Sequence, residues 1–134
     1  MSYVGIKDTL NKYTSKHTET RETHSDEALK TRYYKAMKDK AFNELITMFN
    51  DSNQFEVKST SNERGEMIVT GIGKMKVFII ATVIMVTPNR TAIDFAVSTE
   101  IFLPTDFGHS AKIIKEIYKQ IDSRLEYIGS GLGA

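Results

Sequence analysis

The sequence predicts an α+β domain in which two long helices pack on one face of a four-stranded antiparallel meander, with a short helix at the N-terminus. Apolar residues recur every three to four positions over residues 25–50 and 109–128, a spacing typical of helices that bury one side. Between these segments lie four shorter stretches, apolar or alternating and separated by turn residues, which we expect to be strands.

The run Lys76–Val86 (KVFIIATVIMV) is apolar on both faces of any element it forms. β-branched and aromatic residues dominate it, and Pro88 and Asn89 end it, which indicates a strand covered on both sides. It is shorter than the roughly 20 apolar residues of a membrane span. Because the two long helices cover only one side of this strand, we expect something else to cover the other.

The first 24 residues are predicted to form a short helix and a polar linker. Residues 15–24 (SKHTETRETH) contain no large apolar side chain and indicate the linker. The helix is predicted over residues 3–14, where one side is apolar through Val4, Ile6, Leu10 and Tyr13.

A long helix is predicted over residues 25–50. Ser25 or Asp26 can accept a hydrogen bond from a free backbone N–H at its start, and Asn50 begins the polar stretch that ends it. The apolar side of this helix consists of Leu29, Tyr33, Met37, Ala41, Leu45, Met48 and Phe49.

Four strands are predicted over Phe55–Thr60, Glu66–Ile72, Lys76–Val86 and Thr91–Phe102. Their short connections favour an antiparallel meander. The last strand alternates between a large apolar face and a smaller, more polar one: Ile93, Phe95, Val97, Thr99 and Ile101 point one way, and Ala92, Asp94, Ala96, Ser98 and Glu100 the other.

The second long helix, over residues 109–128, closes a single domain that spans residues 25–128. Gly129 stands where a helix-ending glycine is expected, and residues 129–134 (GSGLGA) are predicted to be a flexible tail. The apolar side of this helix consists of Ile113, Ile114, Ile117, Tyr118, Ile121 and Leu125.

Composition excludes several function classes. The 18 basic and 17 acidic residues give a formal charge of +1, which removes the usual electrostatic argument for nucleic acid or an anionic membrane. The absence of cysteine excludes disulfides and cysteine-based metal sites and fits a reducing compartment. Because the first residues also lack the apolar core of a signal peptide, we expect a cytoplasmic protein.

The segment 104–110 (PTDFGHS) is the strongest local candidate for a site. In a catalytic interpretation, His109 is an acid/base group that Asp106 orients, and Ser110 and free backbone N–H groups at the helix start could bind an anion. In a structural interpretation, which we favour, Asp106 or Ser110 caps the helix and Gly108 makes a tight turn. No other residue supplies an obvious nucleophile.

Two further ligand-binding candidates are Asp94, on the last predicted strand, and Arg90, in the turn that precedes it. If Asp94 is buried it needs a partner, which Arg90, Lys74 or Lys76 could supply; if it is exposed, it only solvates the outer face.

The histidines of the linker do not predict a metal site. His17 and His24 flank Glu19 and Glu22, but their spacing matches no zinc motif. We expect neither a metal nor a cofactor.

The C-terminal half, in which the strand TAIDFAVSTEIFL precedes TDFGHSAKIIKEIYKQID, resembles small uncharacterised bacterial cytosolic proteins. More distantly, residues 25–128 resemble a bacterial domain family of unknown function with an α-ββββ-α order and an Asp-x-Gly turn before the last helix. That turn corresponds to Asp106-Phe107-Gly108, but Ile101-Phe102-Leu103-Pro104 replaces the family's arginine-rich approach to it. The resemblance supports the predicted fold and implies no catalytic role.

Three functions stay open at this point. The first is a non-catalytic interaction module that forms a homodimer through the sheet. The small-residue face of the last strand, at Ala92, Ala96 and Ser98, could meet a second sheet or the N-terminal helix. The second is a binder of a small apolar ligand, held between the sheet and the C-terminal helix, and the third is an enzyme that uses Asp106 and His109. We favour the first because it needs only packing. The adaptable lining of an apolar site would come from Met37, Met48, Met67, Met75 and Met85.

Overall fold

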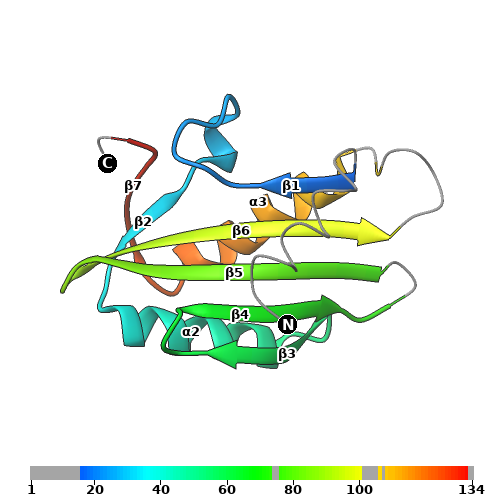
Figure 1. Ribbon diagram of the computed structural model, residues 1–134, viewed down its shortest axis with the longest axis horizontal. Helices are drawn as coiled ribbons and strands as arrows, with labels where there is room; N and C mark the ends of the chain where they lie inside the picture. Colours follow the sequence, from blue (N-terminus) through cyan, green and yellow to red (C-terminus); the bar gives the residue numbers. More distant parts are fainter. Residues whose placement is uncertain (1–15, 74–75, 101–105, 107, 133–134) are drawn as a thin grey trace.

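The computed structural model describes residues 16–73, 76–100, 106 and 108–132, and within them seven antiparallel strands form one sheet. The strand order is β3-β4-β5-β6-β2-β7, and β1 also pairs with β6 (Figure 1). The short helix predicted over residues 3–14 lies outside the described residues. The elements are β1 (His17–Glu19), the 3-10 helix η2 (Glu27–Leu29), β2 (Arg32–Lys35), α2 (Lys38–Asp51), β3 (Phe55–Ser61), β4 (Glu66–Gly71), β5 (Lys76–Thr87), β6 (Arg90–Glu100), α3 (His109–Asp122) and β7 (Glu126–Ser130).

The chain is α+β with an antiparallel sheet, as predicted, but the prediction that a four-stranded meander makes up the whole sheet is wrong. The meander itself, β3 to β6, is present, with each strand within two residues of its predicted bounds. The sheet continues beyond β6 with β1, β2 and β7, which lie in segments predicted to be linker, helix and tail.

The predicted helix over residues 25–50 is divided into η2, β2 and α2. The spacing of Leu29, Tyr33 and Met37 suggested one helical stripe, but Met37 is 59% exposed and precedes α2. In β2, Tyr33 and Tyr34 point to opposite faces of the sheet, since Tyr34 is fully buried and pairs with Thr91 while Tyr33 pairs with Ala92. Adjacent aromatic residues favour a strand, and β6 provides the edge on which it forms.

The second predicted helix, over residues 109–128, ends at Asp122, and β7 then pairs with the free edge of β2. Buried Leu125 anchors the turn between α3 and β7. Residues 129 and 130, predicted to belong to a flexible tail, are the last two of this strand. At Gly131 a Cβ atom would lie 2.9 Å from the carbonyl oxygen of Glu22, so glycine lets the chain pass close to the loop that precedes η2.

The main core lies between the sheet and its two helices. The helix α2 packs against β3 and β5, and α3 against β6 and β1, all on one face of the sheet (Figure 1). The predicted alternation of β6 is confirmed, because Ile93, Phe95 and Val97 are buried in this core. The helices contribute Ala41, Phe42, Leu45, Met48 and Phe49 from α2, and Ile113, Ile114, Ile117, Tyr118 and Ile121 from α3.

The other face of the sheet, which we call the outer face, is buried along part of its length and exposed at one end. Ile80 and Ala96 are buried there and form a second small cluster with Phe78. Towards the β5–β6 turn β5 becomes exposed: Ile84 (48%) lies on the outer face, Met85 (57%) is in register with Thr91 and Tyr34 on the helix-bearing side, and Val86 (49%) follows. The run that the sequence predicts to be covered on both faces is therefore exposed at its C-terminal end.

Gly65 and Gly108 provide a matched test of the turns. Both have a positive φ, 69° and 82°, but a Cβ at Gly65 would lie 2.1 Å from the carbonyl oxygen of Val83, whereas nothing lies within 4 Å of one at Gly108. We expect Gly108→Ala to cost about 1–2 kcal/mol of unfolding free energy from backbone strain alone, and Gly65→Ala to cost clearly more. Chemical denaturation measures both, and equal losses would contradict the close approach of the β3–β4 turn to β5.

Candidate functional site

Asp106 fixes the start of α3 through hydrogen bonds on both carboxylate oxygens. Its Oδ2 accepts from the Thr99 hydroxyl at 2.8 Å and from the backbone N–H of Ser110 at 3.0 Å. Its Oδ1 accepts from the backbone N–H of Gly108 at 3.0 Å. The carboxylate therefore ties the end of β6 to the first turn of α3, as a helix-capping group does.

The electrostatics of Asp106 agree with this capping role. Burial alone would raise the pKa of the carboxyl group, but the hydrogen bonds from Thr99, Ser110 and Gly108 outweigh it and hold the pKa below its usual value. Among the described residues, no hydrogen bond joins this carboxylate to the imidazole of His109. Ser110 is buried, and its hydroxyl lies 2.8 Å from that of Thr18 on β1.

The predicted catalytic segment is thus only partly brought together. Asp106, His109 and Ser110 lie at the start of α3, while Pro104, Thr105 and Phe107 lie outside the described residues. The contacts of Asp106 and Ser110 hold β1, β6 and α3 together. The arrangement positions a helix.

Asp94 occupies the junction where β1 ends and the chain leaves the sheet before β2. Its Oδ1 accepts hydrogen bonds from the hydroxyls of Thr20 and Thr31, each at 2.6 Å. The Thr20 hydroxyl also accepts from the backbone N–H of Phe95 at 2.9 Å. Two threonine hydroxyls are thus among the partners of Asp94. Sequence analysis offered Arg90, Lys74 or Lys76, of which Lys74 lies outside the described residues.

Arg90 belongs to a second group, on the outer face beside Asp94. Its guanidinium lies over the ring of Tyr33, 5.0 Å from the ring centre, and the Tyr33 hydroxyl donates a hydrogen bond to Glu22. Burial and this bond raise the pKa of Tyr33 to about 12. Sequence reasoning missed Tyr33 and Glu22, because it assigned Tyr33 to the core side of a helix. The adjacent tyrosines were the available signal for a strand.

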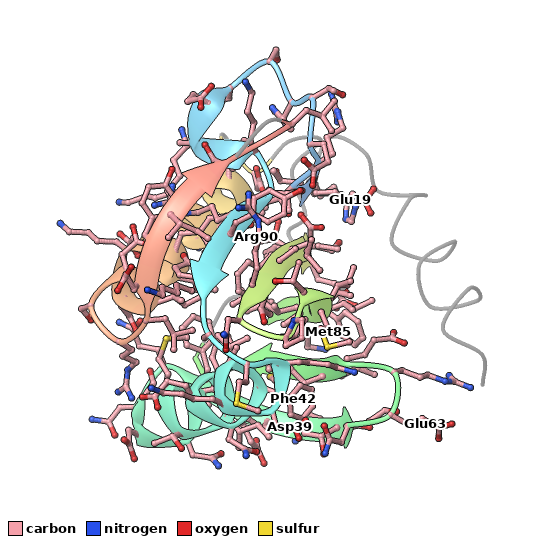
Figure 2. All side chains as sticks on the ribbon, turned by 90° about the vertical axis from the view of Figure 1, so that its left-hand side faces the viewer. Glu19, Asp39, Phe42, Glu63, Met85 and Arg90 are labelled. Carbon is pink, nitrogen blue, oxygen red and sulfur yellow. The ribbon has the colours of Figure 1, made fainter. Side chains whose placement is uncertain are left out.

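This group adjoins the exposed end of the sheet. Tyr33, Ala92 and Ile84 are paired in register across β2, β6 and β5, so they form one row on the outer face. Figure 2, which views this end of the molecule, shows Arg90 above Met85, with Asp39 and Glu63 on the other side of it. We call the exposed residues at this end of β5, Ile84, Met85 and Val86, the apolar end; Ile84 lies on the outer face and Met85 on the helix-bearing side.

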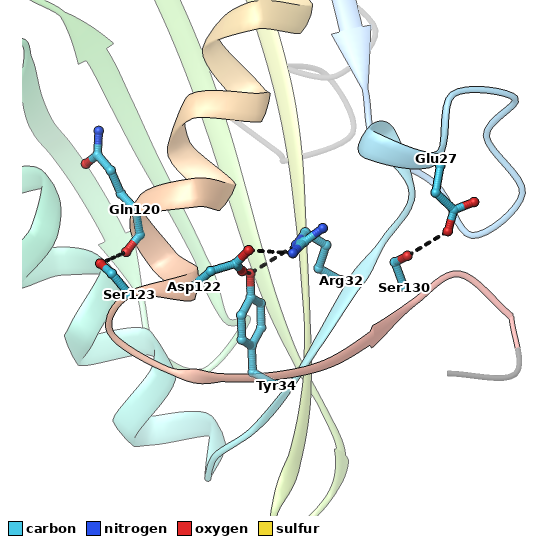
Figure 3. A network of polar contacts seen from close by, with 7 residues as sticks. All are labelled: Glu27, Arg32, Tyr34, Gln120, Asp122, Ser123 and Ser130. Carbon is cyan, nitrogen blue, oxygen red and sulfur yellow. Dashed lines mark hydrogen bonds and ion pairs between the residues drawn. The ribbon is translucent and has the colours of Figure 1, made fainter.

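Arg32 forms a third polar group, between β2, α3 and β7 (Figure 3). Its Nη2 lies 2.5 Å from Oδ2 of Asp122, while Oδ1 of Asp122 accepts from the buried Tyr34 hydroxyl at 2.7 Å. The guanidinium also lies 3.9 Å from the ring centre of Tyr127. Burial and the bond to Asp122 raise the pKa of Tyr34. The network attaches β2 and β7 to the end of α3.

The histidines of the predicted linker lie apart. The His17 side chain is 6% exposed, with Nε2 3.4 Å from a carboxylate oxygen of Glu19. His24 accepts a hydrogen bond at Nδ1 from the backbone N–H of Asp26. Over the part of the chain that the structure describes, no three His, Asp or Glu side chains meet as a metal site would need, and no helix is long and apolar enough to cross a membrane.

Comparison with known proteins adds no relative. No family model matches the chain, and no curated protein matches it. The resemblance of Asp106-Phe107-Gly108 to the turn of a bacterial domain family therefore stays a prediction.

The capping role of Asp106 predicts an acid-dependent stability. The pKa of the Asp106 carboxyl group in the folded protein lies below its ordinary value of 3.8, so the carboxylate stabilises the folded state above pH 3.8. This contribution is lost as the pH falls through the lowered pKa. Asp106→Asn leaves at least one donor unpaired and should cost about 1–3 kcal/mol near neutral pH. Denaturation at several pH values should show that this variant loses less unfolding free energy on acidification than the unmodified protein does. Asp39→Asn, an exposed control, should leave the profile unchanged.

The Arg32 network predicts a difference between two ion pairs of similar appearance. Asp122→Ala removes the partner of Arg32, 16% exposed, and of the buried Tyr34 hydroxyl, and should cost about 2–3 kcal/mol. Glu44→Ala breaks the more exposed pair with Arg124 and should cost less than about 1 kcal/mol. Equal losses in chemical denaturation would show that Arg32 gains nothing from its burial.

Proposed function

We propose that this protein is a non-catalytic interaction module that self-associates through the outer face of its sheet, at the apolar end. We also propose that the protein is located in the cytoplasm, and the absence of cysteine supports this location. The observation that carries it is the exposure of Ile84, Met85 and Val86, three consecutive apolar residues of a strand whose preceding residues are largely buried.

The position of the interface follows from what is already buried. Ala92, Ala96 and Ser98, the small residues that first suggested sheet-to-sheet packing, are only 5–7% exposed in the single chain. They leave little surface for a partner, whereas Ile84 lies on the same face and is 48% exposed. A partner therefore meets the outer face beside the β5–β6 turn.

A second copy of the chain is the occupant we propose. The net charge of +1 opposes self-association only weakly. A standard interface involves 20–30 residues on each side, and the apolar end is small by that measure. We therefore expect a dissociation constant in the micromolar range or weaker.

The other two hypotheses receive less support. Of the methionines that could line an apolar site, Met48 and Met67 are buried in the core and Met37 and Met85 are exposed, while Met75 lies outside the described residues. For the enzyme hypothesis, the hydrogen bonds of Asp106 serve the helix start.

Sedimentation measurements on the full chain test the proposal. The unmodified protein should show reversible dimer formation between about 1 μM and about 1 mM, and Ile84→Asp should weaken it at least 10-fold because a charge would be buried in an apolar contact. Ile72→Asp is the matched control, since Ile72 is 58% exposed and lies outside the apolar end. A protein that stays monomeric throughout this range, or that loses association equally in both variants, contradicts the proposal.

A further inference from the structure

The loop between β1 and β2, residues 20–31, is closed near its tip by a histidine ring. The backbone N–H of Asp26 donates a hydrogen bond to Nδ1 of His24 at 3.0 Å. An imidazole nitrogen accepts a hydrogen bond only while it carries no proton. Histidine is also the side chain that changes charge near neutrality, and this loop contains no other one. The contact therefore exists only with the neutral form of His24.

Asp26 in turn fixes both the 3-10 helix of the loop and its attachment to α3. Its Oδ1 accepts from the backbone N–H of Ala28 at 3.0 Å, which caps η2, and its Oδ2 lies 3.0 Å from Nζ of Lys115 on α3. The backbone N–H of the buried Leu29 donates to the Asp26 carbonyl at 2.9 Å. Because these three contacts all converge on Asp26, they depend on the position that the His24 ring gives to its backbone.

The surroundings of His24 disfavour its protonation while the loop is closed. Burial lowers the pKa of His24, and so do two cations that face it, Arg21 on the same loop and Lys115 on α3; the carboxylate of Asp26 opposes them without reversing the shift. The closed loop is therefore fully stabilised above the ordinary pKa of 6.5, and it loses this stability as the pH falls from 6.5 to the lowered pKa.

We propose that His24 is a pH-sensitive latch, whose protonation removes the acceptor of the Asp26 N–H and releases the tip of the loop, with η2, from α3. The base of the loop is held by bonds that do not involve the imidazole. The Thr31 N–H donates to the Arg21 carbonyl at 3.2 Å, and the Gly131 N–H donates to the Thr31 carbonyl at 2.8 Å. Acidification thus loosens one surface loop while the strands on either side of it stay paired. This device is separate from the proposed self-association.

Nuclear magnetic resonance of the full chain tests the latch at the backbone amides of Ala28 and Leu29, which both bond to Asp26. Their protection against hydrogen exchange, corrected for the intrinsic exchange rates, should fall on the order of 10-fold between about pH 7.5 and about pH 5, because one hydrogen bond is lost. The fall should follow the titration of the His24 ring signals. His24→Ala, which has no acceptor, should show low protection at both pH values.

His24→Asn is the matched variant. An asparagine oxygen can accept from the N–H two residues further along the chain and does not titrate, so protection should stay high at both pH values. His109→Asn, at the start of α3, should keep the response of the unmodified protein. The latch is overturned if the His24 ring titrates while the protection of Ala28 and Leu29 stays constant, or if His24→Asn keeps the pH response. Dimer formation is not the readout, so a monomeric protein would contradict the proposed function and leave this test intact.

Discussion

The rest of the structure depends on the hydrogen bonding of β6, which is paired along both of its edges. On one edge it pairs with β5 from Arg90 to Glu100, and on the other with β1 and then β2. Between those two partners the Thr20 hydroxyl binds the Phe95 N–H, and the Thr20 N–H binds the Phe95 carbonyl. A buried strand must have its backbone groups satisfied, so this junction lets the chain leave the sheet for the loop before β2 without leaving β6 exposed.

The carboxylates that would suggest chemistry in the sequence stabilise this arrangement. Asp94 holds Thr20 and Thr31 at the β1–β2 junction, and Asp106 holds Thr99 and the start of α3. An acid that accepts two or three hydrogen bonds from its own chain has few lone pairs left for a substrate. Among the described residues, the apolar end instead exposes side chains that could meet another molecule. We therefore propose a function for an exposed surface, because the carboxylates of Asp94 and Asp106 already accept hydrogen bonds within the chain.

The parts of the fold that local pattern decides could be predicted, and the parts that pairing decides could not. The strands β3 to β6 alternate clearly and end at turn residues, so their bounds follow from the sequence. The strand β1 has only three residues and β2 only four, and their strand conformation comes from the edge of β6. Leu29 and Tyr33 share a helical spacing only by coincidence. The same error affected the candidate site. Arg90 and Asp94 were identified from the sequence, but the contact of Arg90 with Tyr33 was not predicted, because Tyr33 was assigned to the core side of a helix.

The two edges of the sheet are less suited to binding a partner than the apolar end is. The outer strand β3 carries a bulge after Val57 and an ion pair between Lys58 and Glu56, features that oppose pairing with another chain. The other outer strand, β7, has only five residues. The apolar end, by contrast, is part of the longest hairpin of the described sheet and is fixed by eleven paired positions between β5 and β6. A partner that binds there meets a preformed surface, so little conformational entropy is lost on binding. Rigidity would thus compensate for the small area of the interface that we propose.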